Sequence, residues 1–355
     1  MATHIPAIAR RWSVMGQDGI ESLVYGDVPV PALRDNEVLV QIRGASLNPR
    51  DLMISRGNYP WTVKPGVVPG SDGAGVVLSV GKSVTRFQPG DRVITMLNQK
   101  HITGSVTVEI AQFGTGASVD GVFCSSGAFD EQALVSMPDG LSFVQAATLS
   151  CAGLTAWNAL FGLSGKQVTA GQWVLVQGTG GVSLFALQFA RSVGARVIAT
   201  TSSPDKVEFL RELGADHVIN YQDIPKWGAV AKELTGGCGV DLVVDIAGPT
   251  TLRESAACVK LDGTIAVVGI AGGSPEGQEM PTLLEAWLNL YTARGVWVGS
   301  RVQMEEMCRW IDAHPDFRPV LDSKEFKLSQ LKEAYEYVAS GKSLGKGQPT
   351  QHLYP

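Results

Sequence analysis

Cysteine and histidine are scarce in this sequence, and their scarcity limits the metal chemistry it can support. The five cysteines, at positions 124, 151, 238, 258 and 308, are far apart and include no C-x-x-C pair. The five histidines are equally scattered and include no H-x-x-x-H pair. Such spacing provides neither a disulfide framework nor a structural zinc knuckle. We therefore expect reduced thiols.

Long apolar runs and an excess of basic residues are also missing. Runs such as DLVVDIAG and TIAVVGIAGG are far shorter than the roughly 20 residues that span a bilayer. The N-terminal MATHIPAIARRWSVMG lacks the continuous apolar region of a secretory signal. A net charge of −5, with no Lys/Arg run longer than a dipeptide, provides no field for nucleic acid. We expect a soluble, cytoplasmic protein that binds a small molecule and neither nucleic acid nor membrane.

Apolar residues are abundant, by contrast, and their pattern divides the chain. With 45% hydrophobic residues in 355, the chain can bury a large core, and its length favours two domains. Between about Glu37 and Val135, short β-branched runs are separated by glycine and proline. These runs are EVLVQIRGASL, GAGVVLSVG, DRVITML and EQALVSM. They predict an irregular all-β domain.

From about Leu149 onward, apolar strands alternate with helical patterns of 10 to 15 residues. The strand-like runs are WVLVQG, RVIATT, HVIN, VDLVVDIAG and GTIAVVGI. Alternation of this kind predicts an α/β fold with a doubly wound parallel sheet. After Gly273 the pattern is less regular, with a strand-like GVWVGS and two helical stretches, VQMEEMCRWIDAH and LSQLKEAYEYVAS.

The first strand-to-helix turn of this half carries a dinucleotide-binding pattern. Within WVLVQGTGGVSLFALQFA, the G-x-G-x-x-small positions are Gly178, Gly180 and Ser183, and the turn also contains Thr179, Gly181 and Val182. The first glycine permits the sharp turn, the second admits a pyrophosphate, and the small third residue lets helix and strand pack closely. N–H groups at the helix start then bind phosphate. A purely structural glycine turn is the alternative, but the flanking strand and helix favour a dinucleotide.

The end of the next strand predicts which dinucleotide. NAD sites usually place an acidic residue there, whereas ATTSSPDK offers hydroxyls and a cation, which suit a 2′-phosphate. The candidate residues are Thr201, Ser202, Ser203 and Lys206, with Tyr221 as a stacking neighbour. Ser203 capping the following helix is a compatible alternative, and Asp205 adds a negative charge nearby. We expect NADP(H) rather than NAD(H).

These motifs, with LNPRDL, PGSDGAGVV, VGKSVTRFQPGDRV, LTAWNAL and LGADHVINY, resemble the medium-chain dehydrogenase/reductase superfamily. The nearest branch is the zinc-independent one of zeta-crystallin-like quinone oxidoreductases and enoyl reductases. The resemblance implies a GroES-like catalytic domain over residues 1–148 and a Rossmann domain over 149–290. A C-terminal segment, 291–355, would mostly return to the catalytic domain. The resemblance also implies an active site in the cleft between the domains, and a homodimer.

The resemblance lets the three catalytic zinc positions be compared one by one. Zinc alcohol dehydrogenases hold Cys, His and Cys where this chain has Asn48, Ser71 and Cys151. Amide and hydroxyl oxygens are poor zinc ligands beside thiolate and imidazole. The stretch between about Asn98 and Val122, which would carry structural zinc, has no cysteine. We expect no metal, with Cys151 a packed small residue.

Without a metal, the stretch SLNPRDLMISRGNYP supplies the catalytic candidates. Hydride transfer to an enone or a quinone leaves a delocalised enolate or phenolate, which hydrogen bonds and a weak acid can stabilise. Asn48 can donate a hydrogen bond, and the RGNYP context gives Tyr59 the proton-donor role of enoyl reductases by resemblance. Tyr59 packing against PWTVKP is the alternative. Asp51 is a further candidate acid, although an ion pair with Arg50 that orders the Asn48 loop is more consistent with its position.

The resemblance implies further neighbours of the nicotinamide, namely Thr155, Gly269 and Val298, the last in a strand over Val296–Val298. A helix-packing role is the alternative for Thr155. The C-terminal SLGKGQPTQHLYP departs from the family, and its Gly347 and Pro349 predict a poor closing strand.

Together these features predict a metal-independent, NADPH-dependent reductase of activated C=C bonds or quinones. Two alternatives stay open. One is an alcohol dehydrogenase or ketone reductase of the same superfamily that uses Tyr59 or Asp51 as its acid. The other is a catalytically silent NADPH-binding protein.

Overall fold

The computed structural model describes residues 5–273, 277, 279–341 and 346–349. The chain forms two compact units: the first is Met1–Leu154 with Ser300–Pro355, and the second is Thr155–Gly299. The boundaries therefore lie a few residues later than the expected 148/149 and 290/291. The second boundary lies after the expected 290/291 because Thr292–Gly295 is a strand of the second unit's sheet.

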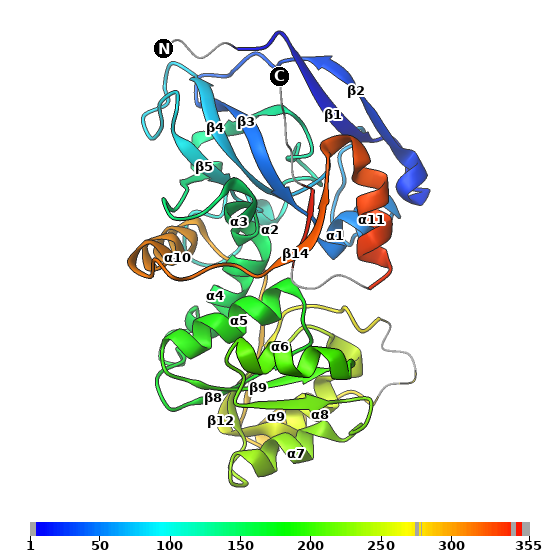
Figure 1. The fold of residues 1–355 in the computed structure, drawn as a ribbon, viewed down its shortest axis with the longest axis vertical. Coiled ribbons are helices and arrows are strands. Elements are labelled where there is room, and N and C mark those ends of the chain that lie inside the picture. Colours follow the sequence, from blue (N-terminus) through cyan, green and yellow to red (C-terminus); the bar gives the residue numbers. More distant parts are fainter. Residues whose placement is uncertain (1–4, 274–276, 278, 342–345, 350–355) are drawn as a thin grey trace. The chain divides into compact units, whose positions relative to one another are not determined.

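The first unit is built on a five-stranded antiparallel sheet with the order β6-β3-β4-β5-β7 (Figure 1). Its strands are β3 (Glu37–Ser46), β4 (Asp72–Val80), β5 (Arg92–Thr95), β6 (Ser126–Asp130) and β7 (Leu134–Ser136). A hairpin of β1 (Ile8–Val14) and β2 (Leu23–Pro29) and the pair β14 (Leu321–Phe326) and β15 (Lys346–Pro349) complete its strands. The predicted strands of this stretch are confirmed, but the stretch is not all-β, because it also contains two short helices, Pro49–Ser55 and Val108–Ala111.

Short helices surround this sheet. They are α1 (Pro49–Ser55), α2 (Val108–Ala111), α3 (Phe143–Ala147), α10 (Arg301–Ala313) and α11 (Leu331–Ala339). Single 3-10 turns occur at Gly19–Ser22, Glu131–Ala133 and Leu328–Gln330, and a π-helical turn at Leu149–Gly153. Alternate residues of β3, including Val38, Val40 and Ile42, are fully buried with Phe123 of a nearby loop. Because a strand's side chains alternate between faces, one face of β3 contributes to this core.

The second unit is a six-stranded parallel sheet with the order β10-β9-β8-β11-β12-β13. Its strands are β8 (Trp173–Gln177), β9 (Arg196–Thr201), β10 (His217–Asn220), β11 (Val240–Asp245), β12 (Val259–Val267) and β13 (Thr292–Gly295). Its helices are α4 (Leu154–Phe161), α5 (Gly181–Ser192), α6 (Val207–Glu212), α7 (Trp227–Leu234), α8 (Leu252–Cys258) and α9 (Leu283–Leu288), with 3-10 turns at Pro204–Lys206 and Gly248–Thr250. The predicted α/β class with a doubly wound parallel sheet is confirmed.

The sheet order explains where a ligand can bind in the second unit. All residues of β8 are buried, as expected for a central parallel strand covered on both faces. The chain crosses from β8 out to β10 and then returns to the other side of β8 at β11. Ligands of such sheets bind at the carboxyl ends of the strands next to this reversal.

One prediction about the C-terminal third was wrong. The last strand of the second unit is Thr292–Gly295 rather than Val296–Val298, and Val298 has a φ of +49°, which is incompatible with an extended strand. Gly347 and Pro349, which were expected to give a poor closing strand, lie in the four-residue β15, which pairs in parallel with β14 in an irregular register. An edge strand tolerates proline because the missing N–H can face away from the partner strand.

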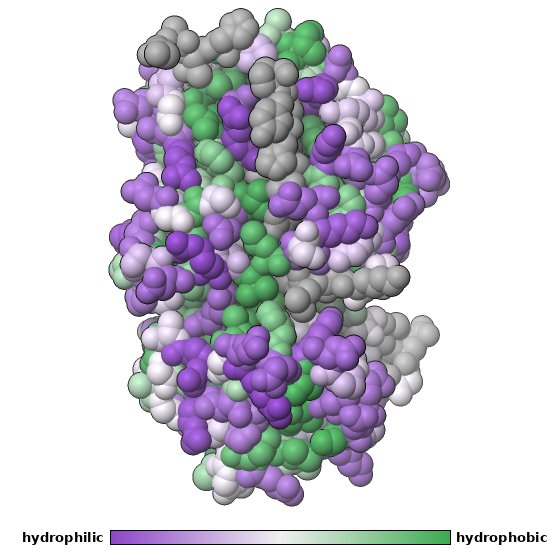
Figure 2. Space-filling view, viewed as in Figure 1, coloured by the Kyte–Doolittle hydropathy of each residue, from purple (hydrophilic) through white to green (hydrophobic). Residues whose placement is uncertain are grey.

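The surface is mixed in character. Figure 2 shows hydrophilic residues interspersed with apolar ones over one face of the molecule. Helix α9 presents large apolar side chains to solvent, with Leu283 90% and Trp287 68% exposed. The expected homodimer stays a prediction. Among the described helices, none has both the length and the apolar character needed to cross a membrane.

The contact between β3 and β4 depends on a glycine, which gives a test of the sheet. A Cβ on Gly75 would lie 2.1 Å from the backbone oxygen of Gln41, whereas one on Gly140 would meet nothing within 4 Å. We expect Gly75→Ala to lower the free energy of unfolding by about 2 kcal/mol or more, because the strands must separate. Gly140→Ala is the control and should change it by less than about 1 kcal/mol. Equal urea unfolding curves for the two variants would contradict this packing.

Candidate functional site

The helix that carries the catalytic candidates, α1, begins with an N-terminal cap. The backbone N–H of Asn48 donates to the Asp51 carboxylate over 2.9 Å, and Pro49 occupies the first helical turn. The Asp51 side chain is fully buried. A carboxylate at a helix N-terminus is stabilised by the unpaired N–H groups there. Asp51 therefore caps this end of α1, a contact that the sequence did not predict.

Asn48 also joins a chain of hydrogen bonds that leads to the first residue of β4, Asp72. Its side-chain amide donates to the Ser71 hydroxyl over 3.3 Å, and that hydroxyl donates to the Asp72 carboxylate over 2.9 Å. The hydroxyl of Thr95, in β5, donates to the backbone oxygen of Ser71 and so stabilises the segment that leads into β4. Asn48, Ser71 and Asp72 are all buried. These polar groups are satisfied by one another.

Tyr59 follows α1 and lies beside Arg50, which is in the first turn of that helix. Arg50 donates to the Tyr59 hydroxyl oxygen from Nη2 over 3.1 Å and from Nε over 3.3 Å. Its remaining terminal nitrogen, Nη1, donates to the Thr115 backbone oxygen over 2.9 Å and lies 3.7 Å from the Asp51 carboxylate. The expected Arg50–Asp51 pair is thus present, although the hydrogen bonds of Arg50 go to Tyr59 and Thr115.

The charge of Arg50 is stable in this environment. Burial alone would lower its pKa, but the Tyr59 phenol and the Asp51 carboxylate raise it more, so the pKa of Arg50 lies above its ordinary value. The side chain is only 11% exposed. A permanent, nearly buried cation therefore lies against the Tyr59 phenol.

A pocket of about 320 Å³ opens beside Tyr59. One wall is the segment Tyr59–Thr62, and the other comes from α2 and the following loop, including Gln112, Gly114 and Ser118. Its size falls within the range of small-ligand pockets. Tyr59 and Trp61 give it an aromatic side, with ring centroids 5.2 Å apart. The pocket can hold a small, partly apolar molecule next to Tyr59.

Tyr335 of α11 lies beneath this region and was missed by the sequence analysis. It is fully buried in the core that includes α1 residues, and within the described part of the chain its hydroxyl has no hydrogen-bond partner. Burial, together with the Asp51 carboxylate, raises the pKa of Tyr335 well above its ordinary value. Tyr335 is therefore a neutral, buried packing residue.

In the second unit, the predicted dinucleotide turn lies at the carboxyl end of β8. Gly178 has a φ of +74°, a conformation that favours glycine, and its N–H donates to Thr200 of β9. A Cβ at Gly178 or Gly180 would meet nothing within 4 Å, so both glycines face open space. The Ser183 hydroxyl donates to the Gln177 backbone oxygen over 2.6 Å, which ties α5 closely to β8. This is the geometry that a pyrophosphate requires.

The turn after β9 lies next to the dinucleotide turn. The Lys206 ammonium donates to the Thr179 hydroxyl over 3.1 Å. Thr201 is buried and its hydroxyl accepts the Ser203 N–H, while Ser202 is exposed. Ser203 makes no side-chain cap to the following turn, so the capping alternative is wrong. A lysine and an exposed hydroxyl are therefore available at the turn where a ribose 2′-group would be recognised.

The other predicted cofactor residues are distributed along the same unit. Val182 lies in the first turn of α5, and the backbone of the partly exposed Tyr221 bonds to Thr201. Gly269 follows β12 at its carboxyl end. Thr155 is buried in α4, and Val298 accepts the Asn158 side-chain amide over 2.7 Å. The role of Thr155 at the nicotinamide stays a prediction.

A buried polar network beside the dinucleotide turn was also missed. The Gln177 amide donates to the Asp245 carboxylate over 3.0 Å and accepts the Ile246 N–H. Asp245 also accepts from Gly248 N–H and from the Ser255 hydroxyl. The network joins the ends of β8 and β11, the two strands on either side of the reversal in strand order. Its only sequence signal is a polar residue at the end of each apolar strand.

Comparison with known proteins fits both units. Residues 34–139 match the family model "Alcohol dehydrogenase GroES-like domain", and residues 181–313 match "Zinc-binding dehydrogenase". A zinc-type alcohol dehydrogenase-like protein of Schizosaccharomyces pombe is 42% identical over 330 residues, which cover 92% of this chain and 95% of that protein. The chain belongs to the medium-chain dehydrogenase/reductase superfamily. It is therefore an oxidoreductase of a family that uses a nicotinamide cofactor.

Solved structures of the superfamily extend the comparison. A putative alcohol dehydrogenase from Sinorhizobium meliloti has a TM-score of 0.89 and 34% identity, covering 98% of this chain and all of that one. A quinone oxidoreductase from Pseudomonas syringae has a TM-score of 0.80 and 27% identity, covering 96% and 99%. The superfamily is thus established, while the substrate class differs among these relatives.

The family description includes zinc, but the residues here do not fit a catalytic zinc site. Asn48 and Ser71, at two of the three ligand positions, are hydrogen-bonded to each other and carry neutral oxygens. In the part of the chain that the structure describes, no cluster of three or more His, Cys, Asp or Glu side chains could hold a metal ion. Cys151, at the third position, lies in the π-helical turn and is partly exposed.

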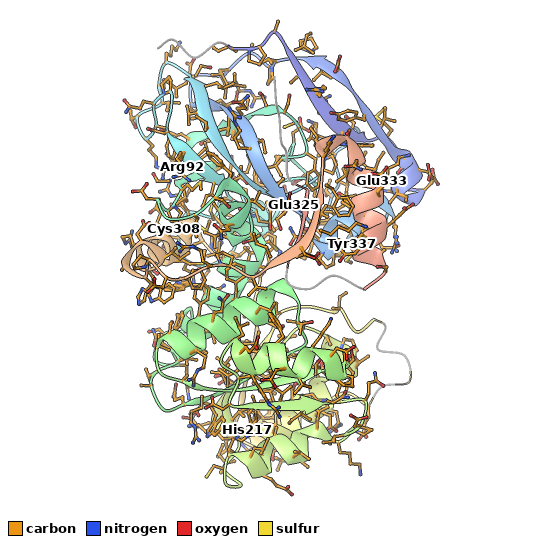
Figure 3. All side chains as sticks on the ribbon, in the orientation of Figure 1. Arg92, His217, Cys308, Glu325, Glu333 and Tyr337 are labelled. Atoms are coloured by element: carbon orange, nitrogen blue, oxygen red, sulfur yellow. The ribbon has the colours of Figure 1, made fainter. Side chains whose placement is uncertain are left out.

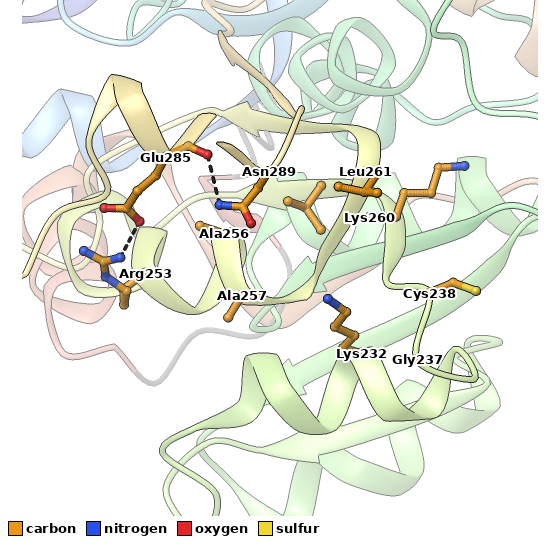
Figure 4. A pocket seen from close by; sticks show the side chains of 11 residues that line it. Lys232, Gly237, Cys238, Arg253, Ala256, Ala257, Lys260, Leu261, Glu285 and Asn289 are labelled. Carbon is orange, nitrogen blue, oxygen red and sulfur yellow. Dashed lines mark hydrogen bonds and ion pairs between the residues drawn. The ribbon is translucent and has the colours of Figure 1, made fainter. Parts of the chain in front are cut away.

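A second pocket, of about 580 Å³, lies in the second unit (Figure 4). It is lined by Lys232, Cys238, Arg253 and Glu285, and by Lys260 near the amino end of β12. Arg253 is paired with Glu285, as the dashed line in Figure 4 shows. Because cofactors of this superfamily's sheet bind at the carboxyl ends, this pocket is not the nicotinamide site.

The unpartnered Tyr335 hydroxyl gives a test of the packing under α1. We expect Tyr335→Phe to leave the free energy of unfolding unchanged or to raise it by up to about 1 kcal/mol, because it removes a buried hydroxyl that lacks a hydrogen bond. Tyr337, on the same helix (Figure 3), donates to Asp322 over 3.1 Å. Tyr337→Phe should therefore lower stability by about 1 kcal/mol. The idea fails if thermal or urea unfolding shows a larger loss for Tyr335→Phe than for Tyr337→Phe.

Proposed function

We propose that this protein is a metal-independent, NADPH-dependent reductase of activated C=C bonds or quinones. The observation that carries the proposal is the pairing of two features in the first unit. A tyrosine whose hydroxyl is held by Arg50 lines a ligand-sized pocket, and the residues at two zinc-ligand positions are bonded to each other. These residues thus offer a proton donor, Tyr59, but no ligand set for a zinc ion that could act as a Lewis acid.

The chemistry follows from what each residue can do. The bound nicotinamide supplies the hydride. Addition of hydride to the β-carbon of an enone, or to a quinone, places negative charge on a delocalised enolate or phenolate. Such a charge needs a hydrogen-bond donor and a proton rather than a metal ion, and the Tyr59 hydroxyl can supply both. The Asn48 amide, bonded to Ser71, keeps the neighbouring turn in place.

Support for NADPH comes from the turn after β9. Lys206 places an ammonium next to Thr179, and Ser202 adds an exposed hydroxyl. A cation and hydroxyl groups favour a 2′-phosphate, whereas NAD sites commonly carry an acidic residue at this turn. Asp205 is exposed and lies in the 3-10 turn that follows.

A second candidate function is carbonyl or alcohol chemistry within the same superfamily. It is favoured by the names of the relatives, since both the S. pombe protein and the S. meliloti structure are described as alcohol dehydrogenases or similar proteins. A ketone substrate would leave a localised alkoxide, which is harder to stabilise without a metal. The missing ligand set therefore favours the first proposal.

A screen of acceptors with the purified protein tests the proposed function. We expect NADPH oxidation with enals, enones or quinones, little with simple ketones, and no loss of kcat/KM after treatment with a strong chelator. The reason is that charge stabilisation comes from Tyr59 rather than from zinc. Stoichiometric bound zinc, with activity that chelation abolishes and zinc restores, would rule the proposal out.

The cofactor assignment makes a separate prediction. Lys206→Ala should raise the KM for NADPH about tenfold, equivalent to about 1.4 kcal/mol, because a charge-assisted contact to the 2′-phosphate is lost. The KM for NADH should change by less than about twofold, since NADH has no such phosphate. Lys226→Ala, at an exposed lysine before α7, is the matched control. An equal effect of Lys206→Ala on both cofactors would remove Lys206 from phosphate recognition.

A further inference from the structure

Arg50 connects the two walls of the pocket beside Tyr59. Its Nη2 and Nε donate to the hydroxyl oxygen of Tyr59, which belongs to one wall. Its Nη1 donates to the backbone oxygen of Thr115, the residue that follows Gly114 of the other wall. Thr115 is itself fixed, because its hydroxyl donates to Met96 and its N–H to Leu97. One guanidinium therefore holds the tyrosine at a set position relative to a rigid loop.

The hydrogen bonds of Arg50 also fix which way the Tyr59 hydroxyl can act. A phenol oxygen has two acceptor positions and one proton, and a guanidinium has donors only. Both Arg50 contacts therefore use Tyr59 as an acceptor, and the phenol proton must point away from Arg50. Among the residues that the structure describes, no acceptor for that proton is found within hydrogen-bond distance. The proton is available to a bound molecule.

We propose that Arg50 is the positioning residue for proton transfer by Tyr59. It orients the phenol so that its proton faces the acceptor, and it stabilises the phenolate that forms when the proton leaves. This inference rests on the proposed function, in which Tyr59 is the acid. It assigns to Arg50 a role beyond the ion pair with Asp51 that the sequence predicted.

The proton-transfer step is balanced as follows. The acceptor gains a hydride from the reduced nicotinamide, which is thereby oxidised, and becomes an enolate or a hydroquinone anion. The Tyr59 O–H bond breaks, its electron pair stays on the phenolate oxygen, and a C–H or O–H bond forms on the product. The phenolate is then adjacent to two N–H groups of Arg50, and a proton from water restores the phenol.

Arginine suits this role better than lysine would. Its planar group presents several N–H donors in a fixed arrangement, so it can contact Tyr59 and Thr115 at the same time. A lysine would keep the positive charge, but its ammonium group on a flexible chain would not hold both contacts in a fixed arrangement. The nearly buried position strengthens the effect, since a charge interaction is screened less there than in water.

A double-mutant cycle on kcat tests the role. We expect Arg50→Met to lower kcat about 100-fold with KM changed by less than about threefold, because proton transfer is affected more than binding. In a Tyr59→Phe background the same change should lower kcat by less than about threefold, since no phenol remains to be positioned. Arg50→Lys should recover part of the loss. Arg92→Met is the control. The Arg50 guanidinium lies over the Tyr59 ring, 5.0 Å from its centroid, and the Arg92 guanidinium lies 5.1 Å from the centroid of Phe143, but Arg92 does not line the pocket (Figure 3).

The outcomes separate the inference from the proposed function. If Arg50→Met lowers kcat equally in both backgrounds, or if Arg92→Met is equally harmful, the positioning role is wrong while the reductase proposal stands. If the wild-type protein turns over no acceptor, the proposed function fails, and the catalytic role of Arg50 fails with it. A double-mutant cycle on the urea unfolding midpoints of the same variants can be measured without any enzymatic activity. Additive effects of Arg50→Met and Tyr59→Phe there would show that the contact itself is absent, which overturns the inference.

Discussion

The contact between the Arg50 guanidinium and the Tyr59 phenol is the interaction on which the first unit's site depends. The same guanidinium also donates to the backbone oxygen of Thr115, so that Arg50 joins α1 both to Tyr59 at the pocket and to the loop at Thr115. Asp51 caps α1 and keeps a negative charge near the guanidinium without competing for the Tyr59 oxygen. The burial of this group of side chains gives each hydrogen bond more weight than it would have in water.

The chain belongs to a family described as zinc-binding dehydrogenases, whereas we propose a metal-independent chemistry for it. The turn PGSDGAG leads into β4, and its Ser71 bonds to Asn48 and Asp72. The amide of Asn48 and the hydroxyl of Ser71 do not attract a divalent cation as thiolate and imidazole do. Loss of the ligand set and presence of an anchored phenol are two separate observations, and both favour acceptors whose reduction spreads the charge.

Much of the second unit could be predicted from the sequence, because its information is local. Buried strands such as WVLVQ are nearly continuous apolar runs. The glycine turn after β8, placed between a buried strand and a helix, is typical of dinucleotide-binding domains. The misplaced strand near Val298 and the short β15 were not predictable in this way, since they depend on pairing between distant segments. The role of Arg50 was missed for the same reason. The sequence shows its neighbour Asp51, but not Thr115.

The most direct test of the central claim is the identity of the product formed from an enone and NADPH by protein freed of metal. An enone offers both a C=C and a C=O bond, so the product reports which of the two receives the hydride. The account predicts the saturated ketone, formed at the same rate whether or not zinc is added. An allylic alcohol that forms only when zinc is present would contradict it.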